Sequence, residues 1–302
     1  MQQPHEQTNV RAPACKMSTT TNLAALAGQI VASRRPRKRY GFVLPFLCYL
    51  LGLFNFPLRH YGPAETSRVE TRGKHVISFS LYGDDARYSD GAIANAKLYK
   101  SVYNDWQMRV YYDHSVPEYV IRTLQLNDVE LVNMSGSSAN KMTWRFLAAS
   151  DPSVSRVCCR DIDSRLSLRE KAAVEEWIFS GKAFHAMRDH PSHSLFALSG
   201  GMWCTRSGEI RNIGDLLEGA RLGNNYLEDM DFLNSIIWPI AKQDILQHDS
   251  FSCQKYNANA FPVPRVGMEH VGAVFVENEM REVDVALLRD AIRRGEDREC
   301  IY

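Results

Sequence analysis

The sequence predicts an α/β fold, with a mainly parallel central sheet covered by helices on both faces and an N-terminal membrane anchor before it. Three observations lead to this prediction. From residue 75 onward, short apolar runs alternate with helix-length amphipathic segments, as in sheets wound on both sides. One apolar run, residues 157–159, ends at two aspartates, Asp161 and Asp163. Residues 41–57 form an uncharged apolar stretch directly after a basic cluster.

The elements follow from periodicity and from turn and capping residues. Asp90 and Ser115 are the expected N-caps of the first two helices, because their side chains can accept a backbone N–H bond. A loop is expected at 247–249. The expected helices span 90–103, 117–126, 141–149, 168–179, 226–240 and 283–293. The expected strands span 75–82, 108–112, 129–132, the run before Asp161, 183–187, 197–204 with an interruption at Gly200 and Gly201, and 271–276.

Composition divides the chain into four regions. Residues 1–39 form a basic, mostly disordered tail, since residues 1–40 carry seven basic side chains and one acidic one. Residues 40–58 form a signal-anchor segment of about 18 uncharged residues, near the lower limit for spanning a bilayer. Residues 59–74 form a polar stem, and residues 75–302 form the catalytic-type domain. The total charge is +1, so the chain after residue 40 carries about −5, and nucleic acid is not an expected partner.

The basic tail is expected to stay cytoplasmic by the positive-inside rule. The expectation is therefore a single-pass type II membrane protein of the Golgi or endoplasmic reticulum, attached to the membrane through residues 40–58, with the folded domain in the lumen. A sequon at Asn133 agrees with a lumenal location. Two other interpretations of the apolar segment stay open, a cleaved signal peptide and a buried core helix.

The seven cysteines show no zinc-type spacing. Cys158 and Cys159 have the character of small apolar strand residues. Cys204, Cys253 and Cys300 can pair in an oxidising compartment, and the sequence leaves the pairing open.

The two aspartates after the apolar run carry the chemistry. Ligands in open α/β sheets bind beyond the carboxyl ends of the strands, so Asp161 and Asp163 are expected to face a crevice. Residues i and i+2 of an extended segment point to the same side. Two converging carboxylates repel each other unless a cation joins them, and oxygen ligands favour Mn²⁺ or Mg²⁺, whose open positions substrate phosphates fill. The alternative is a solvated turn.

The motifs in their order resemble the GT-A-fold glycosyltransferases that use nucleotide sugars, and within them the glycogenin and bacterial galactosyltransferase group (family 8-like). The resemblance covers most of residues 75–250. Its motifs are Tyr82-Gly83, Trp144-Arg145-Phe146-Leu147, Asp161-Ile162-Asp163, Ser199-Gly200-Gly201 and Asp229-Met230-Asp231-Phe232-Leu233-Asn234.

The resemblance implies roles for individual residues. Tyr82 would stack on the base of the nucleotide, expected to be uracil, with Asp84 or Asp85 near it. Arg145 would contact the donor and steady the acidic motif, and Asp161 and Asp163 would hold Mn²⁺ against the diphosphate. Gly200 and Gly201 would let a sugar approach the backbone closely.

The third metal ligand is expected to be His248, with His270 as the second choice, although this chain lacks the longer C-terminal histidine motif of the family. Asp229 and Asp231 are the catalytic candidates, with Asp229 beside the sugar. Methionine replaces the family's middle glutamine at position 230, so the stereochemical outcome is open, with retention favoured over inversion. If the enzyme inverts, Glu228, Asp229 or Asp231 would be the general base.

Asp189, between two basic residues, is a further candidate and can hydrogen-bond sugar hydroxyls; a salt-bridged loop is the alternative. The expected function is metal-dependent transfer of a sugar from a nucleotide sugar, with UDP as the expected nucleotide, to a glycan or glycoprotein acceptor. Two rival interpretations are a haloacid-dehalogenase-like phosphohydrolase, which has an equivalent Asp-x-Asp, and a non-catalytic lumenal binding protein with the same fold.

Overall fold

The computed structural model describes residues 73–223, 225 and 227–300. The predicted tail (1–39) and anchor (40–58) and nearly all of the predicted stem (59–74) lie outside the described residues. In the part of the chain that is described, no helix is both long enough and apolar enough to cross a membrane.

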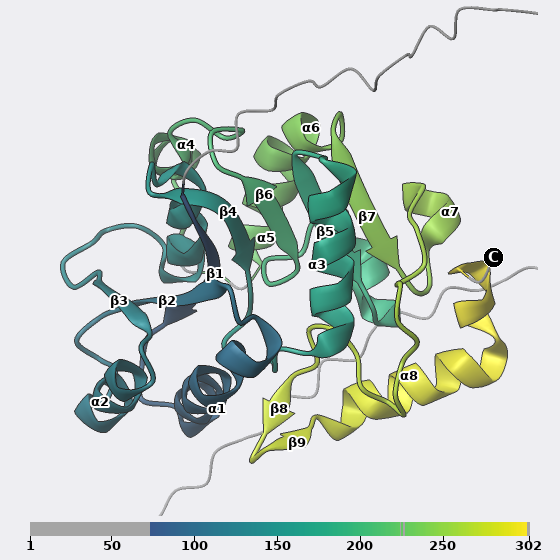
Figure 1. Cartoon of the computed structure of the whole chain (residues 1–302), viewed down its shortest axis with the longest axis horizontal. Coiled ribbons are helices and arrows are strands. Elements are labelled where there is room, and N and C mark those ends of the chain that lie inside the picture. Colours follow the sequence, from purple (N-terminus) through teal and green to yellow (C-terminus); the bar gives the residue numbers. More distant parts are fainter. Residues whose placement is uncertain (1–72, 224, 226, 301–302) are drawn as a thin grey trace, which may run out of the picture. The chain divides into compact units, whose positions relative to one another are not determined.

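A seven-stranded sheet forms the centre of the described region, in the order β3-β2-β1-β4-β6-β5-β7 (Figure 1). Every neighbouring pair is parallel except the two pairs that include β6. The predicted α/β class with a mainly parallel sheet is therefore confirmed. The strands are β1 (Lys74–Leu81), β2 (Trp106–Tyr112), β3 (Glu130–Asn133), β4 (Val154–Cys159), β5 (Phe184–Arg188), β6 (Trp203–Arg206) and β7 (Ile245–Asp249).

Helices cover both faces of this sheet. One core layer joins the sheet to α1, α2 and α3, and the other joins it to η2, α4, α5 and η4. The helical segments are α1 (Ala86–Val102), α2 (Glu118–Leu126), η2 (Lys141–Ser150), α3 (Leu168–Ser180), η3 (Pro191–Leu195), α4 (Ile213–Ala220), α5 (Glu228–Phe232), η4 (Leu233–Ile237), α6 (Trp238–Ala241), α7 (Cys253–Tyr256), α8 (Glu282–Arg294) and η5 (Glu296–Cys300).

Strand alternation determines which of the two adjacent cysteines, Cys158 or Cys159, forms a disulfide. Cys158 and Cys159 point to opposite core layers, as successive strand residues must. Cys158 lies directly across from Cys204 on β6 and forms a disulfide with it, so the prediction of a merely apolar role for Cys158 is wrong. A second disulfide joins Cys253 to Cys300, and Cys159 is a buried free thiol.

Several predicted boundaries are corrected. Asp85, not Asp90, caps α1, accepting the N–H of Arg87 at 2.8 Å. Ser115 does not cap α2; its hydroxyl accepts the N–H of Gly83 at 2.7 Å instead.

The remaining corrections lie in the C-terminal half. Residues 247–249 belong to strand β7 rather than to a loop, and Gly200 and Gly201 precede β6 instead of interrupting it. The helix predicted over 226–240 is three consecutive segments, α5, the π-helical η4 and α6. The strand predicted over 271–276 is a short hairpin of β8 (Phe275–Val276) and β9 (Glu279–Met280).

The direction of the strands determines where the site lies. β1, β4 and β5 run in the same direction, because β6 is antiparallel to both of its neighbours. The segments that follow these three strands therefore leave the same edge of the sheet, where ligands of open α/β sheets bind.

Candidate functional site

A cavity of about 680 Å³ opens at this edge. Its lining comes from the end of β1, the first turn of α1, η2, the loop after β4, the segment after β5, α5, the segment before β8 and the N-terminal end of α8. Six predicted site residues line it: Tyr82, Arg145, Asp161, Asp163, Gly200 and Asp229.

The loop with the two aspartates is held from behind by α1. The buried Asn95 amide donates to the carbonyl oxygens of Ile162 at 3.2 Å and Ser164 at 2.8 Å. Gly91 lets the helix come close, since a Cβ there would lie 2.2 Å from the carbonyl oxygen of Ile162. The loop is thus pinned through its backbone, which leaves both carboxylates to face the cavity.

Arg145 joins two carboxylates across the cavity floor. One guanidinium nitrogen lies 2.7 Å from Asp161 Oδ1, and the other lies 3.0 Å from Asp229 Oδ2. The two anions raise the pKa of Arg145 above its ordinary value, although burial alone would lower it. Its planar fork suits two separate partners better than a lysine would. Arg145 therefore fixes the distance between the loop after β4 and helix α5.

Asp163 pairs with a residue that the sequence analysis missed. The guanidinium of Arg87, in the first turn of α1, lies 2.6 Å from Asp163 Oδ2 and lines the same cavity. Burial and the nearby Asp161 charge raise the pKa of Asp163 despite this partner. The available signal was a basic residue two positions after the cap of the helix that follows β1.

Asp229 is the buried acid of α5. Burial and the charge of Asp161 raise its pKa, and the ion pair with Arg145 opposes this shift. Beside it, the N–H of Gly200 lies 3.1 Å from Met230 Sδ, so the methionine that departs from the family pattern contacts the glycine motif. A Cβ at position 200 would lie 2.5 Å from both Arg145 and Asp229, so a larger residue there would displace the ion pair between them.

Gly201 lies behind Asp161. A Cβ at position 201 would lie 2.1 Å from Asp161 Oδ2 and 2.7 Å from its backbone nitrogen. The carboxylate can rotate away, but the backbone cannot. We therefore expect Gly201→Ala to reduce the free energy of unfolding by about 1–3 kcal/mol, as overpacking does. Thermal unfolding of the variant and of the wild type measures this loss of stability.

Gly219→Ala is the matched control for this prediction. Gly219 lies in helix α4, and a Cβ there meets nothing within 4 Å. Gly219 is the second-last residue of α4, and alanine there restricts the unfolded chain, so it is expected to stabilise by roughly 0.4–1 kcal/mol. Equal melting temperatures for the two variants would contradict the close contact between Gly201 and Asp161.

His193 also lines the cavity and was missed. It follows β5 in η3, and its Nδ1 accepts the N–H of Asp189 at 3.2 Å. The neutral ring therefore carries its proton on Nε2. Burial and the neighbouring rings of His190 and His270 keep its pKa well below the usual value. His193 is thus a neutral N–H donor, suited to a phosphate or hydroxyl oxygen.

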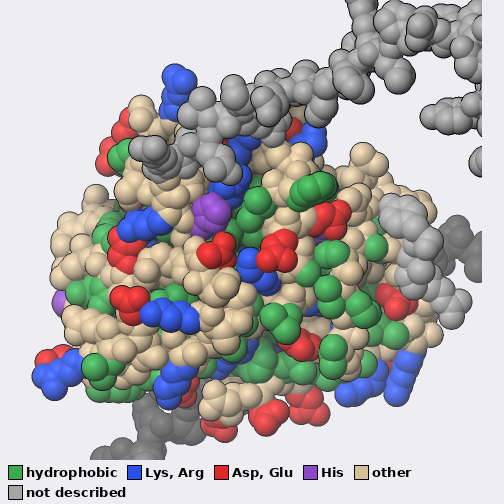
Figure 2. Space-filling view, in the orientation of Figure 1, with side chains coloured by type: hydrophobic (Ala, Val, Ile, Leu, Met, Phe, Trp, Pro, Cys, Tyr) green, Lys and Arg blue, Asp and Glu red, His purple; other side chains and the backbone are tan. Residues whose placement is uncertain are grey.

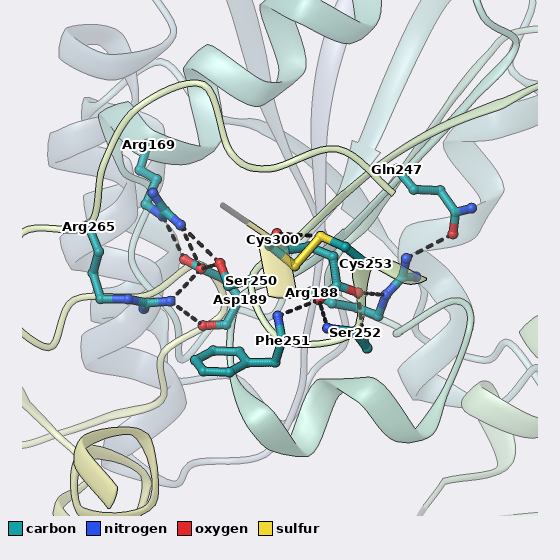
Figure 3. Close-up of a disulfide and its surroundings, with 11 residues drawn as sticks. Arg169, Arg188, Asp189, Gln247, Ser250, Phe251, Ser252, Cys253, Arg265 and Cys300 are labelled. Atoms are coloured by element: carbon teal, nitrogen blue, oxygen red, sulfur yellow. Dashed lines mark hydrogen bonds and ion pairs between the residues drawn. A yellow bond between two sulfur atoms is a disulfide. The ribbon is translucent and has the colours of Figure 1, made fainter. Parts of the chain in front are cut away.

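Asp189 is not at the cavity; it belongs to a buried ion-pair network (Figure 3). Its carboxylate accepts from Arg169 at 2.9 Å, from Arg265 at 2.6 Å and from the N–H of Val271 at 2.9 Å. All of its acceptor positions are directed to the protein, and the side chain is fully buried. The prediction that Asp189 contacts sugar hydroxyls is therefore corrected: through its backbone, Asp189 orients His193.

His248, the predicted third metal ligand, also lies outside the cavity lining. Its Nδ1 lies 2.8 Å from Nε2 of His185, its Nε2 lies 3.3 Å from Glu176, and the side chain is buried beneath the sheet edge. The second choice, His270, stacks on His190 with ring centroids 4.8 Å apart and does not line the cavity. Neither histidine reaches the two aspartates, because β7 and the segment after it are packed into other contacts.

Two further predicted residues lie outside the cavity lining. Asp84 and Asp231 are both exposed, Asp84 in the loop after β1 and Asp231 on the outer face of α5. Tyr82 is placed as expected in the cavity wall, with its ring edge-on to Trp144 at 6.1 Å.

The donor set suits a hard divalent ion. Asp161 and Asp163 each pair with an arginine through one carboxylate oxygen, which leaves the second oxygen of each for a metal ion. The repulsion that raises the pKa of Asp163 is what a cation would relieve. Within the described residues, three potential ligand atoms cluster at Asp249, Cys253 and Cys300, but both cysteines are in a disulfide. Ligands beyond the two carboxylates would be substrate oxygens and water, which is usual for Mg²⁺.

No protein-family model matches the chain, and no curated protein matches it in sequence. Among solved structures, the glucosyl-3-phosphoglycerate synthase of Mycobacterium tuberculosis is 15% identical over 59% of this chain and 71% of its own, with a TM-score of 0.38. A mannosyltransferase from Pyrobaculum calidifontis, in complex with GDP-Man and Mn²⁺, is 13% identical over 58% and 55%, with a TM-score of 0.37.

A third solved structure, an active-site mutant of LgtC, is 14% identical over 63% of this chain and 79% of its own, with a TM-score of 0.40. At identities and TM-scores this low, the cavity has to be interpreted from its own geometry.

Proposed function

We propose that this chain is a metal-dependent glycosyltransferase of the GT-A type, which moves a sugar from a nucleotide sugar to an acceptor hydroxyl. One observation carries the proposal. Asp161 and Asp163 leave the end of β4 into a large cavity in which a buried arginine ties Asp161 to a third acid, Asp229. A paired acidic motif at the carboxyl edge of a parallel sheet is suited to holding a metal–diphosphate group.

The residues of the cavity divide the work. Asp161 and Asp163 would hold Mn²⁺ or Mg²⁺, which offsets the charge that develops on the departing nucleotide. Tyr82 offers an aromatic wall for the base, expected to be uracil. Arg145 and Arg87 keep the carboxylates in place, and Arg87 lies where it can also meet a phosphate oxygen.

Asp229 is the acid we place beside the reacting sugar. Its raised pKa makes it a stronger base than an exposed aspartate, and it is held in position by Arg145. His193 would donate its Nε2–H to a phosphate or hydroxyl oxygen of the bound substrates. Retention stays the favoured outcome, with Asp229 positioning the sugar while the leaving phosphate receives the proton of the acceptor hydroxyl.

The test is release of nucleotide from a panel of UDP-sugars and GDP-mannose. Slow release is expected in the presence of Mn²⁺ even without acceptor, and EDTA should stop it. The two rival functions give different results. A haloacid-dehalogenase-like phosphohydrolase would instead cleave p-nitrophenyl phosphate, whereas a binding protein would show a thermal shift with UDP and Mn²⁺ but no turnover.

We also propose that the folded domain acts in the lumen of the Golgi or endoplasmic reticulum, attached to the membrane by residues 40–58. Two disulfides suit an oxidising compartment. The sequon residue Asn133 is exposed at the end of β3, where an enzyme can reach it.

Expression of the full chain in a eukaryotic secretory system tests this location. The protein should lose mass on treatment with an N-glycosidase, and Asn133→Gln should remove the loss. Alkylation without reduction should label Cys159 only after unfolding and none of the four paired cysteines. An unglycosylated product whose Cys158, Cys204, Cys253 and Cys300 all react would contradict lumenal folding.

The charged surface gives no single-sign patch on the face in view. Basic and acidic side chains are interspersed there, with hydrophobic side chains between them (Figure 2). We therefore attribute the binding of a nucleotide sugar and of a glycan or glycoprotein acceptor to the cavity, and not to long-range electrostatic attraction by this surface.

A further inference from the structure

The cavity has two chemically different walls. One wall, formed by the first turn of α1, η2, the loop after β4 and α5, carries the charged groups Arg87, Arg145, Asp161, Asp163 and Asp229. The second wall, formed by η3, the segment after it, the residue before β8 and the start of α8, carries several apolar side chains together with Ser192, His193 and the Arg281–Asp284 ion pair. Its apolar members are Leu195, Phe196, Val274, Val283 and Leu287.

Three of these apolar side chains are open to solvent. Leu195 is 73% exposed, Val283 56% and Leu287 50%. Val283 and Leu287 are four residues apart on α8, so they lie on the same face of the helix, away from the buried Leu288. Such exposure places them at the mouth of the cavity and not on its floor. A contiguous apolar surface beside a polar cleft marks a binding surface.

The wall is also fixed in position. His190 Nε2 lies 3.0 Å from the carbonyl oxygen of Asp284, which ties the start of η3 to the start of α8. Arg281 and Asp284, the two charged residues that this region adds to the cavity lining, form a two-point ion pair with both contacts at 2.9 Å. A bound group therefore meets a preformed apolar surface without a net charge.

We propose that this wall, here called the acceptor wall (Leu195, Phe196, Val283 and Leu287), binds an alkyl chain on the acceptor, so that the acceptor is an amphiphile such as a glycolipid rather than a free glycan. The inference rests on the proposed function. It follows from continuity: one cavity joins the acceptor wall to Asp229. With the nucleotide on the Tyr82 side, an acceptor whose hydroxyl reaches Asp229 extends its remaining part along the acceptor wall.

The test measures binding of methyl, hexyl and octyl β-D-glucosides and β-D-galactosides to the full chain, below the micelle concentration, by titration calorimetry. A fully buried methylene is worth about 0.8 kcal/mol, which is about a fourfold change in Kd. Because the wall is half open, we expect a two- to fourfold fall in Kd per methylene from hexyl to octyl. Equal Kd values across the series would overturn the inference.

Two variants test whether the alkyl chain binds at the acceptor wall. Leu287→Gln combined with Val283→Thr should remove the dependence on chain length. Leu126→Gln is the matched control, because Leu126 is 87% exposed on α2 outside the cavity lining. It should keep the full dependence. A dependence that survives in the double variant would place the alkyl chain elsewhere, including on the apolar segment at 41–57, and would overturn the assignment.

Two further outcomes are separated in the same preparation. Sedimentation velocity of the wild type and of the double variant detects a second copy of the protein bound at the acceptor wall. Dimers that form with the wild type but not with the double variant would explain the exposed side chains by self-association and would overturn the proposal. Acceptor-free release of nucleotide by the wild type tests the glycosyltransferase function separately. Nucleotide release without chain-length dependence rejects the amphiphilic acceptor alone, whereas chain-length dependence without nucleotide release rejects the role of the alkyl group as part of an acceptor.

Discussion

Replacing Asp163 with asparagine is expected to lower nucleotide-sugar turnover by about 10³-fold. The amide keeps the shape of the side chain but cannot offset the charge of a divalent ion. A loss of about 4 kcal/mol of transition-state stabilisation corresponds to this factor. The measurement is nucleotide release at saturating Mn²⁺, and a variant that keeps a tenth of the wild-type rate would contradict a ligand role for Asp163.

Stability separates this effect from misfolding. Burial and the Asp161 charge raise the pKa of Asp163, so its ionised form costs folding free energy above that pKa and the cost disappears as the pH falls through it. The metal-free variant should therefore melt at or above the wild-type temperature at neutral pH. Mn²⁺ should raise the melting temperature of the wild type alone. Asp128→Asn is the control, an exposed acid paired with Lys100 at 2.9 Å, and should change neither quantity.

Arg145→Gln is expected to cost about 3–5 kcal/mol of stability in addition to activity. The substitution leaves the buried Asp229 carboxylate without its partner, and an uncompensated buried charge is expensive. For a folded unit of this size the loss corresponds to a fall in melting temperature of roughly 10 °C. Arg145→Lys should retain only part of the wild-type stability, because one ammonium group cannot hold two carboxylates in this geometry.

A double variant tests the cause. Arg145→Gln with Asp229→Asn removes the orphaned charge, so it should recover much of the lost stability while turnover stays absent. The matched surface control is Arg122→Gln, whose partner Glu118 and own side chain are both mostly exposed. Such pairs contribute at most about 1 kcal/mol. Failure of the double variant to regain stability would show that the Asp229 pair is not the cause of the loss, which would then come from packing or from the pair with Asp161.

Local patterns were enough for the framework of the molecule. Strand and helix periodicity predicted the α/β sheet with helices on both faces, because each element must bury one face. The apolar run before Asp161 was enough to place this residue and Asp163 at the edge of the sheet, since a buried strand delivers the residues after it to its own end. Arg145 could be predicted from the motif resemblance.

Side chains that depend on distant partners were not predictable in this way. Asp189 has the local context of a functional loop, yet its carboxylate meets Arg169 and Arg265, which lie 20 and 76 positions away in the chain. His248 belongs to β7, and its ring is occupied by His185 and Glu176 from other elements. Arg87 and His193 show no motif of their own, and they became visible once the ends of β1, β4 and β5 were brought to one edge.

By itself, the sequence determined the fold class and the position of the two aspartates, because these depend on residues that are neighbours in the chain, and the motif resemblance added Arg145. Only the tertiary structure decided which charges remain free for a ligand. The reason is physical: a carboxylate or imidazole can serve a substrate only if no other segment of the chain already satisfies its hydrogen bonds, and those segments meet only when the sheet is assembled.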